Sequence, residues 1–139
     1  MKKVKIRIAG DLFLKDEYDL DLVNPNLLDL FDKDSFNIVN LECPILYNDK
    51  KKAIKTGPNL KGNPQSSKNI INYLNINLLT LSNNHIKDYG EGGVLDTMHF
   101  CNQNGFGYTG VGKNLRESKK AYRFNMGKKT FSVINISEN

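Results

Sequence analysis

Apolar and polar residues follow one another along this chain in a strand–helix order. Short, mostly apolar runs predict strands at residues 3–9, 36–41, 76–81 and 106–109. The run at 3–9 alternates apolar with basic residues. Segments of helical periodicity separate the runs, which is the order typical of strands joined by helical crossovers. The pattern therefore predicts an α/β fold with a mostly parallel sheet.

Cap and turn residues indicate where the helices between these strands begin and end. An Asn-Pro pair, an N-cap followed by proline at the first helical position, opens the helices predicted at residues 24–31 and 63–74. A third helix is predicted at about 92–104, and Gly105 can supply the left-handed turn that ends it. A brief helix is predicted near 115–119. The first three helices therefore lie where crossovers between neighbouring strands are needed.

The C-terminal part of the chain has the pattern of a hairpin. Residues 121–126 and 130–136 lie on either side of Gly127 and Lys128, a pair suited to a tight turn. The 139 residues are enough for one domain with one ordinary core. The expected fold is a single α/β domain, with a mostly parallel sheet flanked by helices and a C-terminal antiparallel hairpin.

Polar residues follow three of the predicted strands at the point where each strand ends. Asp11 follows the first strand, Glu42 the second, and Asn83-Asn84-His85 the third. If these strands are parallel neighbours, their carboxyl ends share one edge of the sheet, which is where ligands bind in open α/β sheets. Carboxylate and amide oxygens with an imidazole nitrogen suit Mn, Mg, Fe or Zn. Either carboxylate alone is weak evidence, because carboxylates often end strands.

The polar loop at residues 82–90 is the most informative stretch of the sequence. It carries two adjacent amides, an imidazole and the Asp88 carboxylate, a set that can bind a metal or move a proton. Asn, Asp and Gly are also the residues that tight turns use. The loop alone supports a functional site and a plain turn about equally, so both interpretations stay open.

Composition narrows the classes of protein to which the chain can belong. The net charge is +5, and lysines gather at 50–52 and 55. Such runs are usually solvated loop faces, and a surface for anionic polymers or phosphates is the alternative. Aromatic residues are not interleaved with the basic ones, as they are in many nucleic-acid-binding surfaces. No apolar run is long enough to span a bilayer, and we see no secretory signal in the sequence. A cytoplasmic location is expected for the sequence as given; an N-terminal anchor would instead make the protein membrane-associated or exported.

Cysteine and histidine are scarce. Cys43 and Cys101 form no CxxC pair and lie in apolar surroundings, so they are expected to be free core thiols, which suits a reducing compartment. His85 and His99 are the only histidines, which excludes a histidine-rich metal cage within this sequence. Because His99 falls in the helix predicted at 92–104 without a partner motif, we expect it to have a structural role.

Several motifs together resemble a known family. They are Gly10-Asp11, Asn-Leu-Glu-Cys-Pro at 40–44, Ser-Asn-Asn-His-Ile-Lys-Asp-Tyr-Gly at 82–90, and Gly-Val-Gly-Lys-Asn at 110–114. In this order they are similar to CapA-type proteins of bacterial capsule and poly-γ-glutamate biosynthesis, from about Val4 to Ile136. The block at 82–90 is highly specific, whereas Gly-Asp alone is not. The resemblance implies a calcineurin-like metallophosphoesterase fold, of which this chain would form the N-terminal half.

The resemblance also implies roles for individual residues. Asp11, Glu42 and Asn84 match positions of metal ligands, with Glu42 as the bridging carboxylate. His85 matches the catalytic residue that donates a proton or a hydrogen bond to the phosphate. Asp88 would assist catalysis by orienting His85, or it would cap the next helix.

Other features indicate that the site in this sequence is incomplete. Residue 13 is Phe, where the first motif of that superfamily usually has histidine, and its later histidine motifs have no counterpart here. We therefore expect residues 1–139 to be a single truncated domain. We also expect a divalent metal (Mn, Mg, Fe or Zn) in the full-length protein, and none or a weakly bound one in this segment.

The resemblance implies two alternative functions. One is metal-dependent hydrolysis of a phosphoester in capsule polysaccharide or poly-γ-glutamate biosynthesis, with His85 as the proton donor. The other is non-catalytic binding of an anionic polymer during its assembly or export. The expected partners are an anionic polymer or phosphoester substrate, membrane-associated capsule synthesis machinery for the full-length protein, and a second copy of this segment, but no nucleic acid.

Overall fold

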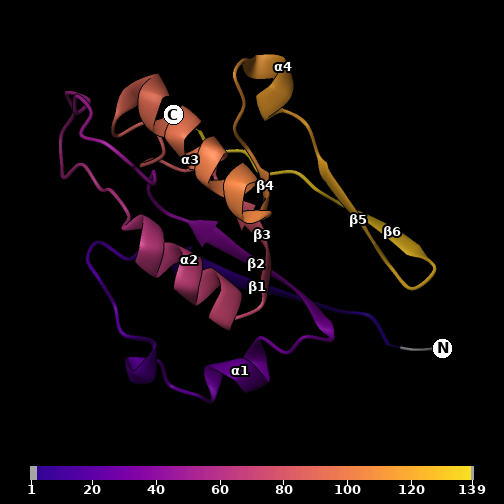
Figure 1. Cartoon of the computed structure of the whole chain (residues 1–139). Helices are drawn as coiled ribbons and strands as arrows, with labels where there is room; N and C mark the ends of the chain where they lie inside the picture. The colour runs from indigo at the N-terminus through magenta and orange to yellow at the C-terminus, as the bar shows by residue number, and fades with distance from the viewer. Residues whose placement is uncertain (1–2, 139) are drawn as a thin grey trace.

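A parallel four-stranded sheet forms the centre of the molecule (Figure 1). In this computed structural model, which describes residues 3–138, the strand order is β1-β2-β3-β4 and every neighbouring pair is parallel. The strands are β1 (Lys5–Leu12), β2 (Ser35–Leu41), β3 (Ile76–Thr80) and β4 (Gly107–Thr109). The prediction of an α/β fold with a mostly parallel sheet is therefore confirmed.

Helices connect these strands. They are the 3₁₀ helix η1 (Leu20–Leu22), α1 (Leu27–Leu30), α2 (Pro64–Tyr73), α3 (Gly90–Asn104) and α4 (Leu115–Ser118). The cap predicted for α2 is present, since the Asn63 side chain accepts a hydrogen bond from the Ser66 N–H at 2.9 Å and Pro64 begins the helix. Gly105 ends α3 in the left-handed conformation, with a φ of 70°. Within residues 3–138, no helix is long and apolar enough to cross a membrane.

The main hydrophobic core lies between the sheet and the two long helices, α2 and α3. Right-handed crossovers in a sheet of order 1-2-3-4 place the connecting helices on one face, and in Figure 1 both helices lie on the same side of the strands. The strands contribute Val39, Leu41, Ile76 and Leu79 to this core, Leu81 joins it directly after β3, and the helices contribute Ile70, Ile71, Val94, Met98, Phe100 and Cys101. The sheet is thus a rigid support for the loops at its carboxyl edge.

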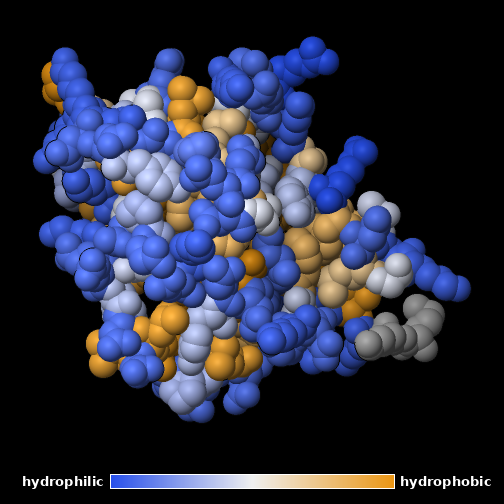
Figure 2. Space-filling model, in the orientation of Figure 1, coloured by the Kyte–Doolittle hydropathy of each residue, from blue (hydrophilic) through white to orange (hydrophobic). Residues whose placement is uncertain are grey.

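The opposite face of the sheet is covered only in part. A hairpin of β5 (Tyr122–Met126) and β6 (Lys129–Val133) extends away from the long helices (Figure 1). Its Phe124 stacks on Phe36 of β2, with ring centroids 3.5 Å apart. The predicted C-terminal hairpin is confirmed, and Figure 2 shows apolar surface at the right of the view, where the hairpin meets the sheet.

The edge strand β1 differs from the prediction in where it ends. We predicted a strand at 3–9 that ended at Gly10 and Asp11, but β1 continues to Leu12. A β-bulge shifts the register against β2 between Ile8 and Asp11, so the chain passes the glycine and pairs again. Asp11 therefore lies inside the strand, with Asn40 as its register partner.

Two further elements are shorter than predicted. The helix expected at 24–31 is the single turn α1, preceded by a turn in which Asn24 Oδ1 accepts a hydrogen bond from the Asn26 N–H at 3.0 Å. The last strand ends at Val133 rather than at residue 136. It stops there because Asn135 turns to the loop after β3, where its Oδ1 accepts a hydrogen bond from the Ser82 N–H.

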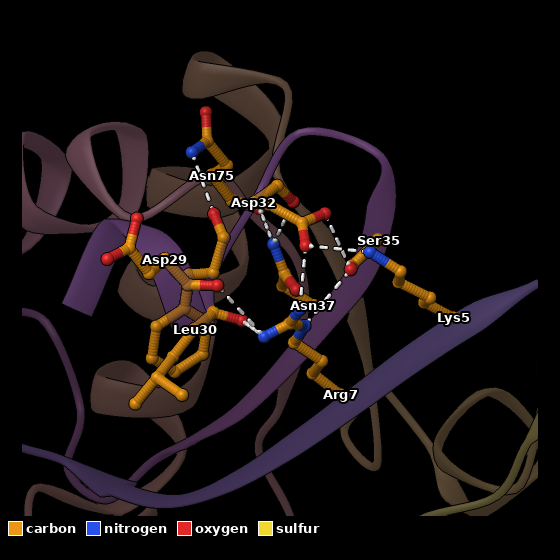
Figure 3. Close-up of polar contacts among 9 residues, drawn as sticks. Lys5, Arg7, Asp29, Leu30, Asp32, Ser35, Asn37 and Asn75 are labelled. Carbon is orange, nitrogen blue, oxygen red and sulfur yellow. Dashed lines mark hydrogen bonds and ion pairs between the residues drawn. The ribbon is translucent and has the colours of Figure 1, made fainter. Parts of the chain in front are cut away.

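A polar network fixes the amino ends of the strands (Figure 3). Arg7 Nη2 pairs with Asp32 Oδ2 at 2.6 Å and Nε donates to Ser35 Oγ at 3.0 Å, while Nη1 donates to two carbonyl oxygens of α1. A hydrogen bond from Ser35, with the charges of Arg7 and Lys5, lowers the pKa of the Asp32 carboxyl although its burial opposes this. The network therefore anchors the first crossover against both β1 and β2.

Asn37 extends this network to β3. Its side chain is fully buried, and Nδ2 donates to the carbonyl oxygens of Asp32 at 3.2 Å and Asn75 at 3.0 Å. Its N–H donates to Asn77 Oδ1 at 2.7 Å. These bonds fix the amino edge of the sheet with polar groups that serve the fold.

Candidate functional site

The carboxyl ends of β1, β2 and β3 meet at one edge of the sheet, as the sequence predicts. Asn40 of β2 donates from Nδ2 to Asp11 Oδ1 of β1 at 2.6 Å. Asn83, in the loop after β3, donates in turn to Asn40 Oδ1 at 3.1 Å. A continuous chain of hydrogen bonds therefore crosses three neighbouring strand ends and joins the first motif to the third.

Asn83 fixes the loop after β3 in place. Only 8% of it is exposed, and its Nδ2 also donates to the Leu41 carbonyl at 2.8 Å, while its Oδ1 accepts from the His85 N–H at 3.0 Å. Its neighbour Asn84 is exposed. The sequence shows two adjacent amides and cannot separate them, but the structure does: Asn83 is used by the fold, and Asn84 is accessible to a ligand.

Two carboxylates stand on the same edge as Asn84. Glu42 directly follows β2 and is half-buried, with its N–H donating to the Leu12 carbonyl at 3.1 Å, and Asp11 is exposed. Within residues 3–138, no group of three Asp, Glu, His or Cys side chains is placed to hold a metal ion. Two carboxylates and one amide supply oxygen donors, which is the ligand type that hard cations such as Mg or Mn prefer.

His85, Asp88 and Lys55 form a second group at this edge. His85 Nδ1 lies 2.8 Å from Asp88 Oδ2, and Lys55 Nζ lies 3.2 Å from the same ring nitrogen while it pairs with Asp88 Oδ1. The sequence left two roles open for Asp88, orienting His85 or capping the next helix. Its contact with the ring nitrogen is the geometry that the first role requires. The N-cap position of α3 is Tyr89, so Asp88 does not cap that helix.

Asp88 is ionised although its side chain is only 1% exposed. Burial raises the pKa of this carboxyl, but hydrogen bonds from Lys55, His85 and the Leu60 N–H, with the Lys55 charge, outweigh burial and leave the pKa below its ordinary value. Because a carboxylate only accepts hydrogen bonds, we assign the proton of the shorter, 2.8 Å contact to His85 Nδ1. The 3.2 Å approach of Lys55 Nζ to the same nitrogen is then not a hydrogen bond, since an ammonium only donates. Nε2 is then the ring nitrogen that can exchange a proton with a ligand.

Asp88 also holds the lysine-rich loop of residues 47–61. Its carbonyl accepts hydrogen bonds from the Ala53 N–H at 2.8 Å and from Asn59 Nδ2 at 2.9 Å, and its Oδ2 accepts from the Leu60 N–H at 2.6 Å. Lys55 adds the ion pair. One buried aspartate therefore fixes both the histidine and a loop that lies about thirty positions earlier in the chain.

The lysines of this loop have different surroundings. Lys50 pairs with Asp96 of α3 at 3.1 Å and Lys55 pairs with Asp88, whereas Lys51 and Lys52 are exposed. The expectation of a solvated loop face therefore describes Lys51 and Lys52, but not Lys50 or Lys55. Sequence reasoning missed Lys55 as a member of the site, because nothing in the local pattern distinguishes it from its neighbours.

A groove of roughly 750 Å³ opens at the carboxyl ends of β3 and β4. It lies between the start of α3 and residues 110–115, and Lys87 and Lys113 are among its lining residues. Asn83 lines the groove and also belongs to the hydrogen-bond chain from Asp11. The groove therefore adjoins the candidate site and leaves room for a ligand larger than a single phosphate.

The two cysteines and His99 have the surroundings of structural side chains. Cys43 and Cys101 are buried free thiols, as predicted, and burial raises the pKa of each to about 12. His99 lies on the exposed side of α3 with its ring against Tyr47, at a centroid distance of 5.9 Å. Neither thiol has the lowered pKa of a nucleophile.

Comparisons with known proteins agree with the motifs at this edge. The family described as "Bacterial capsule synthesis protein PGA_cap" matches residues 5–139. The capsule biosynthesis protein CapA of Bacillus anthracis is 25% identical over 126 residues, which cover 85% of this chain and 31% of that protein. The PGA biosynthesis protein CapA of Bacillus subtilis (strain 168) is 34% identical over 82 residues, which cover 58% of this chain and 21% of that protein.

The chain spans less than a third of the length of each of these curated relatives. The match to the family extends from β1 through the last residue and includes every strand, helix and loop described above. The chain therefore belongs to the PGA_cap family of bacterial capsule synthesis proteins.

Proposed function

We propose that this chain carries part of a metallophosphoesterase-like site that hydrolyses a phosphoester in bacterial capsule polymer synthesis. Membership of the PGA_cap family supports the place in capsule synthesis. The observation that carries the hydrolytic part is the hydrogen-bond chain from Asp11 through Asn40 to Asn83, which continues to the His85 N–H. It holds oxygen donors and an imidazole at one edge of the sheet, where α/β proteins bind ligands.

Asp11, Glu42 and Asn84 are the residues that would hold a divalent cation. Three oxygen donors without a thiolate favour Mg or Mn over Zn. A bound cation would act as a Lewis acid on a phosphoryl oxygen. The exposed Asp11 and Asn84 side chains are accessible to such an ion, and Asn40 orients the Asp11 carboxylate.

His85 is the proposed proton donor to the leaving alkoxide. Asp88 holds the Nδ1 side of the ring, so Nε2 is the atom that gives up the proton. A positioned general acid typically contributes about 10²–10⁴ in rate. Asp88 assists by fixing the ring, which keeps the donor aimed during the reaction.

Binding of an anionic polymer without turnover is the second candidate. The exposed Lys51 and Lys52 support it, because they lie in the loop that Asp88 holds at the site. The ion pairs of Lys50 and Lys55 weaken it, since the charges of these two lysines are already compensated. Hydrolysis therefore has the stronger support.

Replacing His85 tests the hydrolytic proposal. In the full-length protein with Mn²⁺, His85→Ala should lower the hydrolysis of p-nitrophenyl phosphate by about 10²-fold or more, because the proton donor is lost. The fold should persist, since the ring is not part of the hydrophobic core. His99→Ala is the matched control, and it should leave turnover unchanged. Full activity of His85→Ala would exclude this role, and polymer binding would then become the leading candidate.

A further inference from the structure

Lys55 stands where two loops distant in sequence meet at the candidate site. Its Nζ pairs with Asp88 Oδ1 and lies 3.2 Å from His85 Nδ1, while Asp88 Oδ2 contacts the same ring nitrogen at 2.8 Å. The three side chains are 26%, 13% and 1% exposed for Lys55, His85 and Asp88. The cation thus touches both members of the His–Asp pair from a separate segment of the chain.

We propose that Lys55 is a positioning residue, which holds the His85 ring in one orientation and one tautomer by fixing the Asp88 carboxylate. The catalytic consequence rests on the proposed function, but the effect on the ring does not. Lys55 touches neither a substrate nor a metal in this argument, and it acts through Asp88.

The energetic reason lies in the burial of Asp88. A carboxylate with 1% exposure is costly unless its charge is paired and its oxygens accept hydrogen bonds. Lys55 supplies the charge at Oδ1, and the Leu60 N–H and His85 share Oδ2. Without the ammonium, the buried carboxylate loses its paired charge and its contact at Oδ1, so it is no longer held in one position beside Nδ1. The ring can then turn, or its proton can move to Nε2.

The position of Lys55 in the chain also couples the loop to the ring. The loop of residues 47–61 is held by Ala53, Asn59 and Leu60, all of which donate hydrogen bonds to Asp88. When the loop is seated, Lys55 is placed on the carboxylate. The contacts that hold the loop therefore also hold Lys55 on the carboxylate that orients His85.

The test uses the tautomer of His85, read from the ¹⁵N chemical shifts of its ring nitrogens in the full chain at pH 8. The sequence has two histidines, so His99 serves as an internal reference. In the unaltered protein we expect the proton on Nδ1. In Lys55→Met the Nδ1 and Nε2 shifts should move toward each other as the second tautomer is populated, whereas the His99 shifts should stay unchanged.

Further variants separate positioning from a purely structural role. Lys55→Arg keeps the charge and should restore the original ring shifts, and Lys52→Met, at an exposed lysine of the same loop, should leave them unchanged. Lys55→Gln keeps a donor of similar length, so it serves if Lys55→Met does not fold, and it should show the same change in tautomer. Original ring shifts in a folded Lys55→Met or Lys55→Gln protein would overturn the proposal.

Activity provides an independent readout in the full-length protein. If p-nitrophenyl phosphate is hydrolysed, Lys55→Met should lower kcat by about 10–100-fold with little change in KM, because partners that orient a functional group typically have effects of this size. A rise in KM with kcat unchanged would contradict a positioning role. If no variant or parent shows hydrolysis, the proposed function fails, and the ring shifts alone then decide whether Lys55 positions His85.

Discussion

Asp88 accepts hydrogen bonds from two directions, from His85 in its own loop and from the lysine-rich loop of residues 47–61. Its lowered pKa has a consequence for stability. The folded state favours the ionised carboxyl, so Asp88 stabilises the fold. This stabilisation is complete above the ordinary pKa of 3.8, and it is lost as the pH falls through the lower pKa of the folded protein. Acid should therefore loosen the site before it disrupts the core.

Asp88→Asn tests this pH dependence. At pH 7 the free energy of unfolding should fall by about 2–3 kcal/mol, since hydrogen bonds to a charged group contribute about 1.5–3 kcal/mol. Below pH 3.8 the difference from the parent protein should shrink, and Asp32, whose pKa is also lowered, contributes equally to both proteins and cancels from the difference. Urea unfolding at pH 7 and pH 3 measures both values. Asp16→Asn, at an exposed position, is the control, and a constant difference at all pH values would contradict the assignment.

The residues proposed as metal ligands lead to a prediction about the affinity of this chain for a divalent metal. Within residues 3–138, no cluster of three Asp, Glu, His or Cys side chains is placed to hold a metal, so we expect this chain to bind Mn²⁺ weakly, with rapid loss to a chelator. Asp11→Asn should weaken that binding further, because one of two carboxylates is neutralised. Titration calorimetry with Mn²⁺ alone measures both effects. A stoichiometric metal that survives chelator would show that this chain completes the site by itself.

At the scale of elements, the turn after β4 depends on Gly110. Its φ is 97°, and an added Cβ would lie 2.8 Å from the Ser82 backbone nitrogen. Gly105 also has a positive φ, 70°, but open space surrounds it. Gly105→Ala should therefore cost about 1 kcal/mol from backbone strain, and Gly110→Ala clearly more than 2 kcal/mol, since the neighbouring strand end must also move. Denaturant unfolding compares the pair, and equal losses would contradict the argument.

Local signals in the sequence predicted the elements that local contacts determine. The Asn63–Pro64 cap and the Gly105 turn form as expected, because each depends on residues within a few positions. The pattern failed where a distant partner intervenes: the last strand ends at Val133 because Asn135 binds the loop after β3. A similar Asn-Pro pair at 24–25 is followed by a turn and only the short helix α1, so this local signal did not predict the length of the helix.

In the candidate site, too, the sequence predicted what the local pattern determines and missed what a distant contact determines. The strand order placed Asp11, Glu42 and the 82–90 loop at one edge, which follows from the hydrophobic pattern and the geometry of parallel sheets. The contact between Lys55 and Asp88 joins residues 33 positions apart across an irregular loop. No periodicity encodes such a pairing, so only the folded structure could reveal that the loop contributes to the site.

At the scale of the whole molecule, the sheet has one open edge and one partly covered face. The strand β1, eight residues long, pairs only with β2 and leaves its other side without a neighbour among the described residues. Ile8 shares a face with Ile38, its register partner, yet it is 78% exposed because the hairpin does not cover this part of the sheet. A long edge strand next to apolar surface favours pairing with another chain.

We therefore predict that this chain self-associates in solution through the β1 edge. Its apparent mass in sedimentation velocity should rise with protein concentration. Ile8→Lys should weaken the association, since it places a charge on the apolar face and charged edge strands resist pairing. Ile54→Lys is the matched control, because Ile54 is 99% exposed in the lysine-rich loop, away from the sheet edge. A compact monomer at high concentration would contradict the prediction, and equal effects of the two substitutions would place the contact elsewhere.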